Sequence, residues 1–299
     1  MSPALLRALK RLRVSQPFNA VATSALRALL GGSGLEWGLA VRHLHRVGTT
    51  RCRLPNGRTL RLWSRGDDWI SNQVFWRGLK GYEPETVPLF FELASSSEVT
   101  IDVGAHVGFY TLLAAHANPA GRVFAFEPHP VAHERLLRNV GLNGLSHVEC
   151  VQAAAGARDG NADLFHVPGG LPSSSSLCFD FMKSRGDVDR TRVDVVALDG
   201  FLEERRAGRV GLVKIDTEAT EPDVLAGLAG RLRRDRPAIV CEVLKGRGAE
   251  EGLNAALHTL EYRFFLLTPD GPRSREKIEG DERCLNYLLV PRERNVAGL

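Results

Sequence analysis

Short apolar runs alternate with amphipathic segments of helical length along most of the chain. Such alternation is typical of a parallel sheet covered by helices on both faces. The pattern therefore predicts an α/β fold, with a doubly wound, Rossmann-like sheet of seven strands. The strands are expected near residues 98–103, 122–127, 147–153, 211–216, 237–243, 261–268 and 283–290, and the helices near 109–117, 130–142, 199–207, 221–230 and 248–260.

The last two of these strands are joined differently from the others. Their connection, residues 269–281, contains Gly and Pro and is too short for a helical crossover. We therefore expect these two strands to pair antiparallel as a final hairpin. Such a hairpin is typical of class I methyltransferases and not of NAD-binding folds.

A different pattern precedes the alternating region. Residues 1–48 read as helical, and residues 51–63 read as a hairpin whose turn is Pro55-Asn56-Gly57. The sequence therefore predicts a basic N-terminal extension of helices and a hairpin over residues 1–80. A single domain is expected to follow over residues 81–299.

The alternation also lapses between Gly156 and Leu198. Residues 168–176 are rich in Gly, Pro and Ser, and a strand is expected only near 192–198. A long loop inside a compact domain is usually functional or disordered. This one should lie over the C-terminal edge of the sheet, where it could be a lid on the substrate or a flexible serine linker.

The most informative stretch is Val99–Pro128, which reads as strand, glycine turn, helix and strand. Ligands of open parallel sheets sit outside the carboxyl ends of the strands. Gly104 and Gly108 would let the turn approach a cofactor closely, because a Cβ would obstruct the turn or the ligand. Glu127 ends the second strand and is placed to accept both hydroxyl hydrogens of a ribose. The stretch therefore predicts a nucleoside-containing cofactor.

The turn itself distinguishes between cofactors. Dinucleotide-binding turns carry G-x-G-x-x-G, whereas this turn reads Gly104-Ala105-His106-Val107-Gly108 and follows Asp102. A carboxylate would repel a pyrophosphate but attract the ammonium of an amino-acid moiety. S-adenosylmethionine has that ammonium, a ribose diol and a sulfonium, and no phosphate. It is the expected cofactor, with NAD as the alternative, although Asp102 could instead merely cap the turn.

Four ordered blocks extend this pattern. They are D-V-G-A-H-x-G-F-Y, V-F-A-F-E-P, the L-x-x-N-x-x-L-N-G run of Leu136–Gly144, and the K-I-D-x-E-x-x-E run that begins at Lys214. Together they resemble the FkbM family of S-adenosylmethionine-dependent methyltransferases over about residues 80–292. The resemblance implies cofactor contacts from Asp102, Gly104, Ala105, His106, Gly108, Glu127, Pro128, Ala154 (near the adenine) and Asp216.

The chain departs from the family pattern at two places. The family has Asn where this chain has His106, and E-G-A-E where it has Glu218-Ala219-Thr220-Glu221. His106 could be a base, but we favour a hydrogen-bond donor in place of the family's Asn. Ala in place of Gly at position 219 indicates that the backbone there needs no positive φ, or that the site has changed.

Several acids follow the strands at the predicted C-terminal edge. Transfer of a methyl group needs mainly positioning and exclusion of water, but a hydroxyl acceptor also benefits from a general base. Crowded carboxylates would raise at least one pKa or recruit a cation. Glu221 could simply favour the N-terminus of its helix, and no HExxH-type signature predicts a metal. The candidate catalytic residues are Asp216, Glu218, Glu242 and His106.

Positive charge is concentrated near the N-terminus. The net charge is +4, yet Glu36 is the only acid before residue 66. Leu5, Leu9 and Leu12 share one helical face. This basic arm could contact a membrane surface or a carrier protein, act as a targeting segment, or be a solvated helix. Nucleic acid is not expected as a partner, because no aromatic-rich base-binding strip is visible.

Five scattered cysteines without a C-x-x-C pair favour a reducing, cytoplasmic compartment. The predicted function is methyl transfer from S-adenosylmethionine. By resemblance to the family, the acceptor is a hydroxyl of a sugar or natural-product scaffold. The alternatives are a catalytically inactive module that binds a partner through its basic arm, and a nicotinamide-dependent oxidoreductase.

Overall fold

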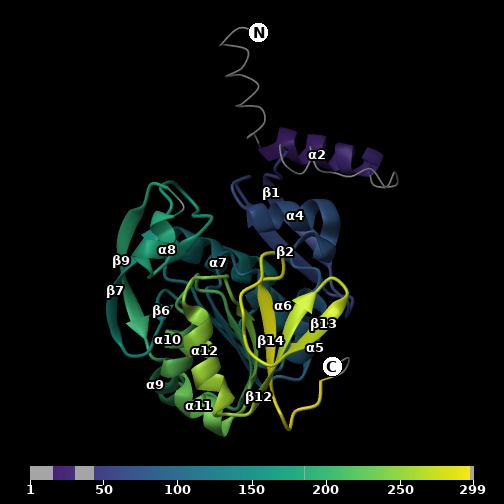
Figure 1. Cartoon of the computed structure of the whole chain (residues 1–299). Coiled ribbons are helices and arrows are strands. Elements are labelled where there is room, and N and C mark those ends of the chain that lie inside the picture. The colour runs from purple at the N-terminus through teal and green to yellow at the C-terminus, as the bar shows by residue number, and fades with distance from the viewer. Residues whose placement is uncertain (1–15, 31–43, 185, 297–299) are drawn as a thin grey trace. The chain divides into compact units, whose positions relative to one another are not determined.

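The protein is described from a computed structural model (Figure 1). The structure describes residues 16–30, 44–184 and 186–296. The chain divides into two compact units, Met1–Pro84 (unit 1) and Glu85–Leu299 (unit 2), and each is treated by itself. The predicted leucine face of residues 5–12 lies outside the described residues.

Unit 1 contains a β-hairpin between helices. Strands β1 (Gly48–Arg53) and β2 (Thr59–Ser64) pair antiparallel along their whole length, which confirms the predicted hairpin. Gly57 has a φ of 81° in the connecting turn, where only a residue without a Cβ is unstrained. The helices are α2 (Gln16–Leu30) and α4 (Trp69–Arg77), and a short 3₁₀ helix, Gly78–Gly81, follows α4.

Unit 2 is built around an eight-stranded sheet with the order β13-β12-β14-β11-β10-β3-β4-β5. The strands from β11 to β5 run parallel, whereas β14 pairs antiparallel with both β11 and β12. The predicted α/β class and antiparallel final strand are therefore confirmed. The strands are β3 (Val99–Val103), β4 (Arg122–Phe126), β5 (Val148–Val151), β10 (Val210–Ile215), β11 (Ala238–Glu242), β12 (Tyr262–Thr268), β13 (Gly271–Arg275) and β14 (Asn286–Pro291).

The eighth strand corrects the predicted count of seven. The sequence predicts a plain connection over residues 269–281, but β13 lies within it and pairs antiparallel with β12. The side chains of β13 are half-buried or exposed. A polar edge strand makes no apolar run, so the hydrophobic pattern does not reveal it.

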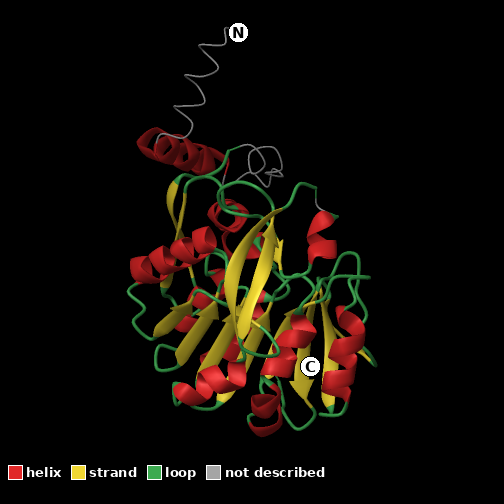
Figure 2. Cartoon of the chain, turned by 90° about the vertical axis from the view of Figure 1, so that its left-hand side faces the viewer, coloured by secondary structure: helices red, strands yellow, loops and turns green. Residues whose placement is uncertain are grey.

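Helices cover both faces of this sheet (Figures 1 and 2). One face packs against α9 to α12, whose apolar side chains join those of the strands in a single buried core. The other face is covered by α5 and α6, where the rings of Phe90 and Tyr110 meet edge to face. The helices are α5 (Val87–Ser95), α6 (Phe109–Ala117), α7 (Pro130–Asn143), α9 (Leu198–Glu204), α10 (Glu221–Gly227), α11 (Ala229–Arg234) and α12 (Ala249–His258).

Strand alternation decides which side chains meet which helices. Successive side chains of a strand point to opposite faces. The residues on either side of Asp102, Lys214 and Glu242 pack into the core beneath α9 to α12. These three polar side chains therefore point to the face that α6 covers. Two contacts from α6, from Thr111 to Asp102 and from Tyr110 to Lys214, agree with this orientation.

The insertion before α9 forms a second sheet. The strand expected near 192–198 is found over Asp189–Val196, whereas the loop predicted for the rest of residues 156–198 is wrong for most of its length. The strand order of this second sheet is β6-β9-β7-β8, and Figure 2 shows the long pair β7 and β9 nearest the viewer. The expected loop remains only over residues 167–174. Many side chains of β7 and β9 are exposed, so they lack an apolar run. The elements are β6 (Ala154–Ala155), β7 (Gly160–His166), β8 (Ser175–Ser176), α8 (Phe179–Lys183) and β9 (Asp189–Val196).

Candidate active site

One half of the candidate site is the turn from β3 to α6, which we call the glycine turn (residues 104–108). The N–H groups of Gly104 and Ala105 both donate to the carbonyl of Phe126, at 3.0 Å each. A Cβ on Gly104 would collide with the backbone oxygen of Asp216, and one on Gly108 would lie 2.6 Å from a methyl carbon of Leu136. The glycines are therefore required by packing within the protein, and their approach to a ligand stays a prediction.

Glu127 joins the glycine turn to the start of α7. Its Oε2 accepts the N–H of His106 at 2.7 Å, and its Oε1 accepts the N–H of His129 at 2.8 Å. Burial raises the pKa of Glu127, while these hydrogen bonds and the nearby His106 oppose the rise. A carboxylate offers about four lone-pair sites. Two are used here, so the capacity to accept two ribose hydroxyls remains.

Asp102 lies directly before the turn and is only 2% exposed. Its Oδ2 accepts the hydroxyl of Thr111 at 2.5 Å. Burial raises the pKa of Asp102 to about 6, opposed by the bond from Thr111 and by the charge of Lys214. The carboxyl is thus bonded to α6 as well as being close to the predicted cofactor edge.

The other half of the site is the turn after β10, which we call the acidic turn (residues 216–221). Glu221 is 2% exposed, and a single oxygen, Oε1, accepts three hydrogen bonds: from the N–H and hydroxyl of Thr217 and from the N–H of Ala219. Burial raises the pKa of Glu221. Its side chain therefore shapes the turn in addition to beginning α10.

The acidic turn contains two residues in left-handed conformations. Glu218 has a φ of 58° and Ala219 a φ of 93°. The expectation that Ala219 needs no positive φ is therefore wrong: the backbone keeps a glycine-type conformation although the side chain is Ala. His106 has a φ of 51° in the glycine turn. Such residues are strained by about 1–3 kcal/mol each and concentrate at functional sites.

Three predicted catalytic acids come together with a buried lysine. Lys214 is 1% exposed, and its Nζ lies 3.2 Å from Oδ2 of Asp216. Glu242, at the end of β11, hydrogen-bonds Asp216, and its pKa is raised well above the usual value by burial and by the charges of Asp216 and Glu218. The expected rise in the pKa of one crowded carboxyl is thus found at Glu242.

The loop between β7 and α8 lies across both turns. The Ser174 hydroxyl donates to Oε1 of Glu218 at 2.8 Å, and the Ser176 hydroxyl donates to the backbone oxygen of Glu218 at 2.6 Å. At the glycine turn, Nε2 of His106 lies 3.0 Å from the carbonyl of Pro172. This serine strap, residues 172–176, therefore covers the edge where the sequence predicted a lid or linker.

A histidine pair lies beside Glu127. The rings of His129 and His166 meet edge to face with centroids 4.6 Å apart. Burial, reinforced by His166 and His106, lowers the pKa of His129 to about 4. Nδ1 of His129 is buried and has no hydrogen-bond partner among the residues that the structure describes. A neutral, unpaired ring nitrogen next to Glu127 suits a polar ligand group.

The remaining predicted residues lie nearby or in structural positions. Pro128 stands between Glu127 and His129 and is half-buried. Ala154 begins β6, and its side chain packs with Leu164 and Val193 in the second sheet. Its contact with an adenine stays a prediction.

Sequence reasoning missed four residues that the structure brings to the site: Lys214, Thr111, Ser174 and Ser176. A charged residue inside the apolar run of β10 was a signal for Lys214. The serine-rich run of residues 168–176 was a signal for Ser174 and Ser176, and no local signal pointed to Thr111.

The donor set fits a cation better than an anion. Asp102, Glu127 and Asp216 place carboxylates around the glycine turn, and this suits an ammonium and a sulfonium rather than a pyrophosphate. In residues 16–30, 44–184 and 186–296, no group of three or more His, Cys, Asp and Glu side chains is arranged to hold a metal ion. No described helix is long and apolar enough to cross a membrane.

Comparison with known proteins gives the family. A methyltransferase FkbM domain matches residues 102–268, more than half of the chain. "Methyltransferase 1" of Beauveria bassiana is 31% identical over 143 residues, which cover 43% of this chain and 57% of that protein. The "31-O-demethyl-FK506 methyltransferase FkbM" of Streptomyces tacrolimicus is 27% identical over 201 residues, which cover 59% of this chain and 74% of that protein.

A solved structure with a similar fold is the methyltransferase FkbM of Methylobacillus flagellatus, at 17% identity and a TM-score of 0.42. The match covers 74% of this chain and 54% of that one. The matched regions thus span little more than half the length of the Beauveria and Methylobacillus proteins, at 57% and 54%. The chain belongs to the FkbM family of S-adenosylmethionine-dependent methyltransferases.

Proposed function

We propose that the protein transfers a methyl group from S-adenosylmethionine to a hydroxyl of a small molecule, such as a sugar or a natural-product scaffold. The observation that carries this proposal is the cluster of Asp216, Glu218 and Glu242 beside the glycine turn. A hydroxyl is a poor nucleophile at neutral pH and benefits from such a base. The name of the Streptomyces relative, which refers to an O-demethyl compound, supports transfer to oxygen.

In this proposal the glycine turn binds the cofactor. Glu127 accepts the ribose hydroxyls with its remaining lone pairs, and the carboxylate of Asp102 attracts the ammonium group. The backbone of the turn, with Pro128 and Ala154, completes the cofactor contacts. His106 orients the serine strap through Pro172 and is not assigned as the base.

The acidic turn serves the acceptor. When bound, S-adenosylmethionine supplies the methyl carbon and keeps the electron pair of the broken bond on sulfur. Asp216 takes the proton of the acceptor hydroxyl while the oxygen of that hydroxyl bonds to the methyl carbon. Glu242 hydrogen-bonds Asp216, and burial raises the pKa of Glu242, which favours its protonated form. Glu218 is held by a hydrogen bond from Ser174.

The test begins with calorimetric titration by S-adenosylhomocysteine, with NAD as a control. It continues with transfer of a radiolabelled methyl group to a panel of methyl glycosides and hydroxylated polyketides. We expect binding of S-adenosylhomocysteine alone and labelling of a hydroxyl acceptor. Binding without transfer to any acceptor would favour the inactive module, and binding of neither nucleotide would contradict the whole proposal.

We further propose that unit 1 binds an anionic membrane surface, because helix α2 buries polar residues and exposes apolar ones. Its polar residues Asn19 and Thr23 are buried at 3% and 2% exposure. Asn19 accepts the N–H of Val47 at 2.8 Å, and Thr23 accepts a bond from Arg46 at 2.9 Å. The outward face carries Phe18 and Val21, at 53% and 70% exposure. The helix thus presents an apolar face to solvent.

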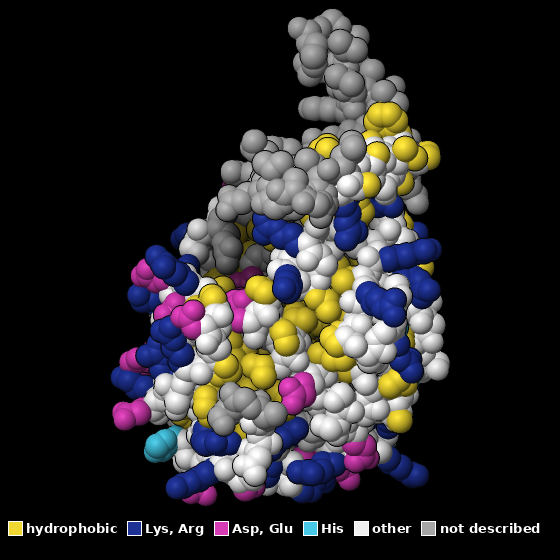
Figure 3. Space-filling model, turned by 90° about the vertical axis from the view of Figure 1, so that its right-hand side faces the viewer, with side chains coloured by type: hydrophobic (Ala, Val, Ile, Leu, Met, Phe, Trp, Pro, Cys, Tyr) yellow, Lys and Arg dark blue, Asp and Glu magenta, His cyan; other side chains and the backbone are white. Residues whose placement is uncertain are grey.

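The charge of unit 1 indicates which partner fits that face. Figure 3 shows hydrophobic side chains of α2 above several Lys and Arg side chains. Among the described residues of unit 1, Asp67 is the only exposed acid. An apolar helix face with surrounding cations is the pattern that binds anionic lipid surfaces. The exposed cations are Arg51, Arg53, Arg58, Arg65, Arg77 and Lys80.

Co-sedimentation with vesicles tests this membrane proposal. The full chain should bind phosphatidylcholine vesicles that contain phosphatidylserine more strongly than vesicles without it. A Phe18→Ser, Val21→Ser variant should lose most of that binding. The matched control is Phe179→Ser, which removes an exposed ring, 46% exposed, from unit 2. Equal binding by both variants, or a change only in oligomeric state, would contradict the proposal.

We also propose that the protein works in the cytoplasm as two domains close to the two compact units. All five cysteines are unpaired, and two of them, Cys52 and Cys241, are buried. Free thiols persist in reducing compartments. Limited proteolysis should cut first near the junction at Pro84 and leave residues 85–299 as a stable fragment.

A further inference from the structure

Lys214 is the least expected residue of the central sheet. It is the last residue but one of β10, an otherwise apolar strand that pairs with β3 on one side and with β11 on the other. Its side chain is 1% exposed. A buried ammonium is costly unless it is paired. The position therefore needs a reason other than packing.

Lys214 contacts residues of the candidate site. Its Nζ is 3.2 Å from Asp216 and 5.2 Å from the ring centre of Tyr110 on α6. Asp102 is its neighbour on β3 in the sheet register. The titratable groups around Lys214 are Asp102 on β3, Tyr110 on α6, Asp216 and Glu218 in the acidic turn, and Cys241 and Glu242 on β11.

Lys214, Asp216 and Glu242 together carry no net charge when one of the two carboxyls is protonated. Asp216 touches both the ammonium of Lys214 and the carboxyl of Glu242. A proton shared between two carboxyls settles on the one farther from a positive charge. The ion pair with Lys214 favours the charged form of Asp216, so the shared proton stays with Glu242.

We propose that Lys214 is a positioning residue for methyl transfer, which holds Asp216 as the ionised base and leaves the shared proton on Glu242. This inference rests on the proposed function. Lys214 acts through Asp216 and touches neither acceptor nor cofactor in this scheme. Asp216 gains the hydroxyl proton during transfer and returns it to solvent afterwards, since it is 25% exposed.

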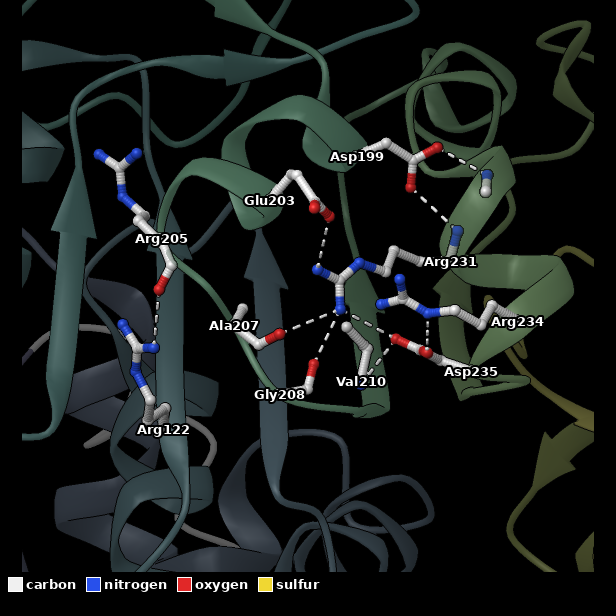
Figure 4. Close-up of polar contacts among 11 residues, drawn as sticks. Arg122, Asp199, Glu203, Arg205, Ala207, Gly208, Val210, Arg231, Arg234 and Asp235 are labelled. Atoms are coloured by element: carbon white, nitrogen blue, oxygen red, sulfur yellow. Dashed lines mark hydrogen bonds and ion pairs between the residues drawn. The ribbon is translucent and has the colours of Figure 1, made fainter.

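A second buried cation shows what a purely structural role looks like (Figure 4). Arg231 is 4% exposed and lies beyond the opposite end of β10. Its Nη1 bonds Asp235 at 3.2 Å and the carbonyls of Gly208 at 2.8 Å and Ala207 at 3.3 Å. Asp235 in turn accepts the N–H of Val210, the first residue of β10. This cation fastens the strand end to α11, far along the strand from the acids.

The experiment compares Lys214→Met, Lys214→Arg and the control Arg231→Met. Without the ammonium, the hydrogen-bonded carboxyls of Asp216 and Glu242 should together bind protons more tightly, so the acid limb of the kcat profile should move up by about one pH unit in Lys214→Met. Activity on that acid limb should fall by up to about tenfold at a given pH, and the loss should disappear at alkaline pH. Lys214→Arg should restore most of the profile. Binding of S-adenosylhomocysteine should change little in any of them.

Arg231→Met should lower stability without moving the profile. A Lys214→Met variant whose activity falls equally at every pH would overturn the inference and leave Lys214 a structural residue. Difference infrared spectroscopy of the carboxyl band, between about pH 5 and pH 9, measures protonation of the carboxyls of the protein without any acceptor present. Identical carboxyl titrations in the unaltered chain and Lys214→Met would also overturn it. Failure of the unaltered chain to bind S-adenosylhomocysteine would instead count against the proposed function.

Discussion

The glycine turn and the acidic turn follow neighbouring parallel strands, and each is organised by a buried glutamate. Glu127 accepts the N–H of His106, and Glu221 accepts the N–H of Ala219. In both cases the donor residue is left-handed, with φ values of 51° and 93°. The two turns therefore share one device, a carboxylate that holds a strained backbone in place.

The turns differ in where their charge lies. In the glycine turn the acids are buried, at 2% exposure for Asp102 and 4% for Glu127. In the acidic turn the Asp216 side chain is 25% exposed and hydrogen-bonds Glu242. Buried, bonded carboxylates suit binding, and an accessible carboxylate suits proton transfer. The comparison indicates two halves of the site. The glycine turn with Asp102 and Glu127 is the cofactor half, and the acidic turn with Glu242 is the acceptor half.

The largest expected effect is on the acceptor half. Asp216→Asn should lower kcat by about 10²–10⁴-fold, because the amide cannot take the hydroxyl proton. Affinity for S-adenosylhomocysteine should fall much less. The measurement is methyl transfer to the acceptor found in the panel, beside calorimetry. A loss confined to cofactor affinity would abolish the proposed division of the two turns.

The next effect separates the two glutamates. Glu127→Gln should weaken binding of S-adenosylhomocysteine by roughly 10–100-fold, because both of its oxygens accept backbone N–H groups and a buried donor would lose its partner. Glu221→Gln should bind almost normally, since its three bonds all end on Oε1 and an amide oxygen can keep them. Calorimetric titration of both variants with S-adenosylhomocysteine measures the difference. Equal losses of affinity would show that the two turns do not differ in cofactor binding.

The pH dependence of stability distinguishes two buried groups of the cofactor half. Burial raises the pKa of Asp102 from 3.8 to about 6, so its contribution to stability is lost as pH rises through that range. Burial lowers the pKa of His129 from 6.5 to about 4, so its contribution is lost as pH falls.

Asp102→Asn should therefore gain about 2–3 kcal/mol of stability relative to the unaltered chain between about pH 4 and pH 7. His129→Gln should show the opposite trend. Urea unfolding across this range measures both. Parallel stability curves for all three proteins would contradict the assigned pKa directions.

The smallest effect concerns the strained residues. Ala219→Gly should raise stability by about 1 kcal/mol, because glycine adopts a φ of 93° without strain. His106→Asn should change stability less, since His and Asn are both enriched among left-handed residues and the bond to Pro172 is lost. Urea unfolding at neutral pH provides the comparison. A destabilised Ala219→Gly variant would mean that the conformation is not strained.

Some of the site could be predicted from local pattern. Gly104, Glu127, Asp216 and Glu242 each stand at or just after the end of an apolar run, so the strand reading alone sends them to one edge of a parallel sheet. The left-handed backbone at Ala219 could not be predicted, because alanine carries no signal for it. Ser174 and Ser176, whose hydroxyls donate to Glu218, lie more than 40 residues from it along the chain.

The sequence by itself determined the alternating strands, the two turns and the antiparallel final strand, since these follow from the spacing of apolar residues and glycines. Only the tertiary structure decided the second sheet and the edge strand β13. Their strands are half-exposed and polar, so burial does not mark them in the sequence. Tertiary structure also decided the role of Lys214, because a charge inside a buried strand gains its meaning from the neighbours that the sheet brings to it.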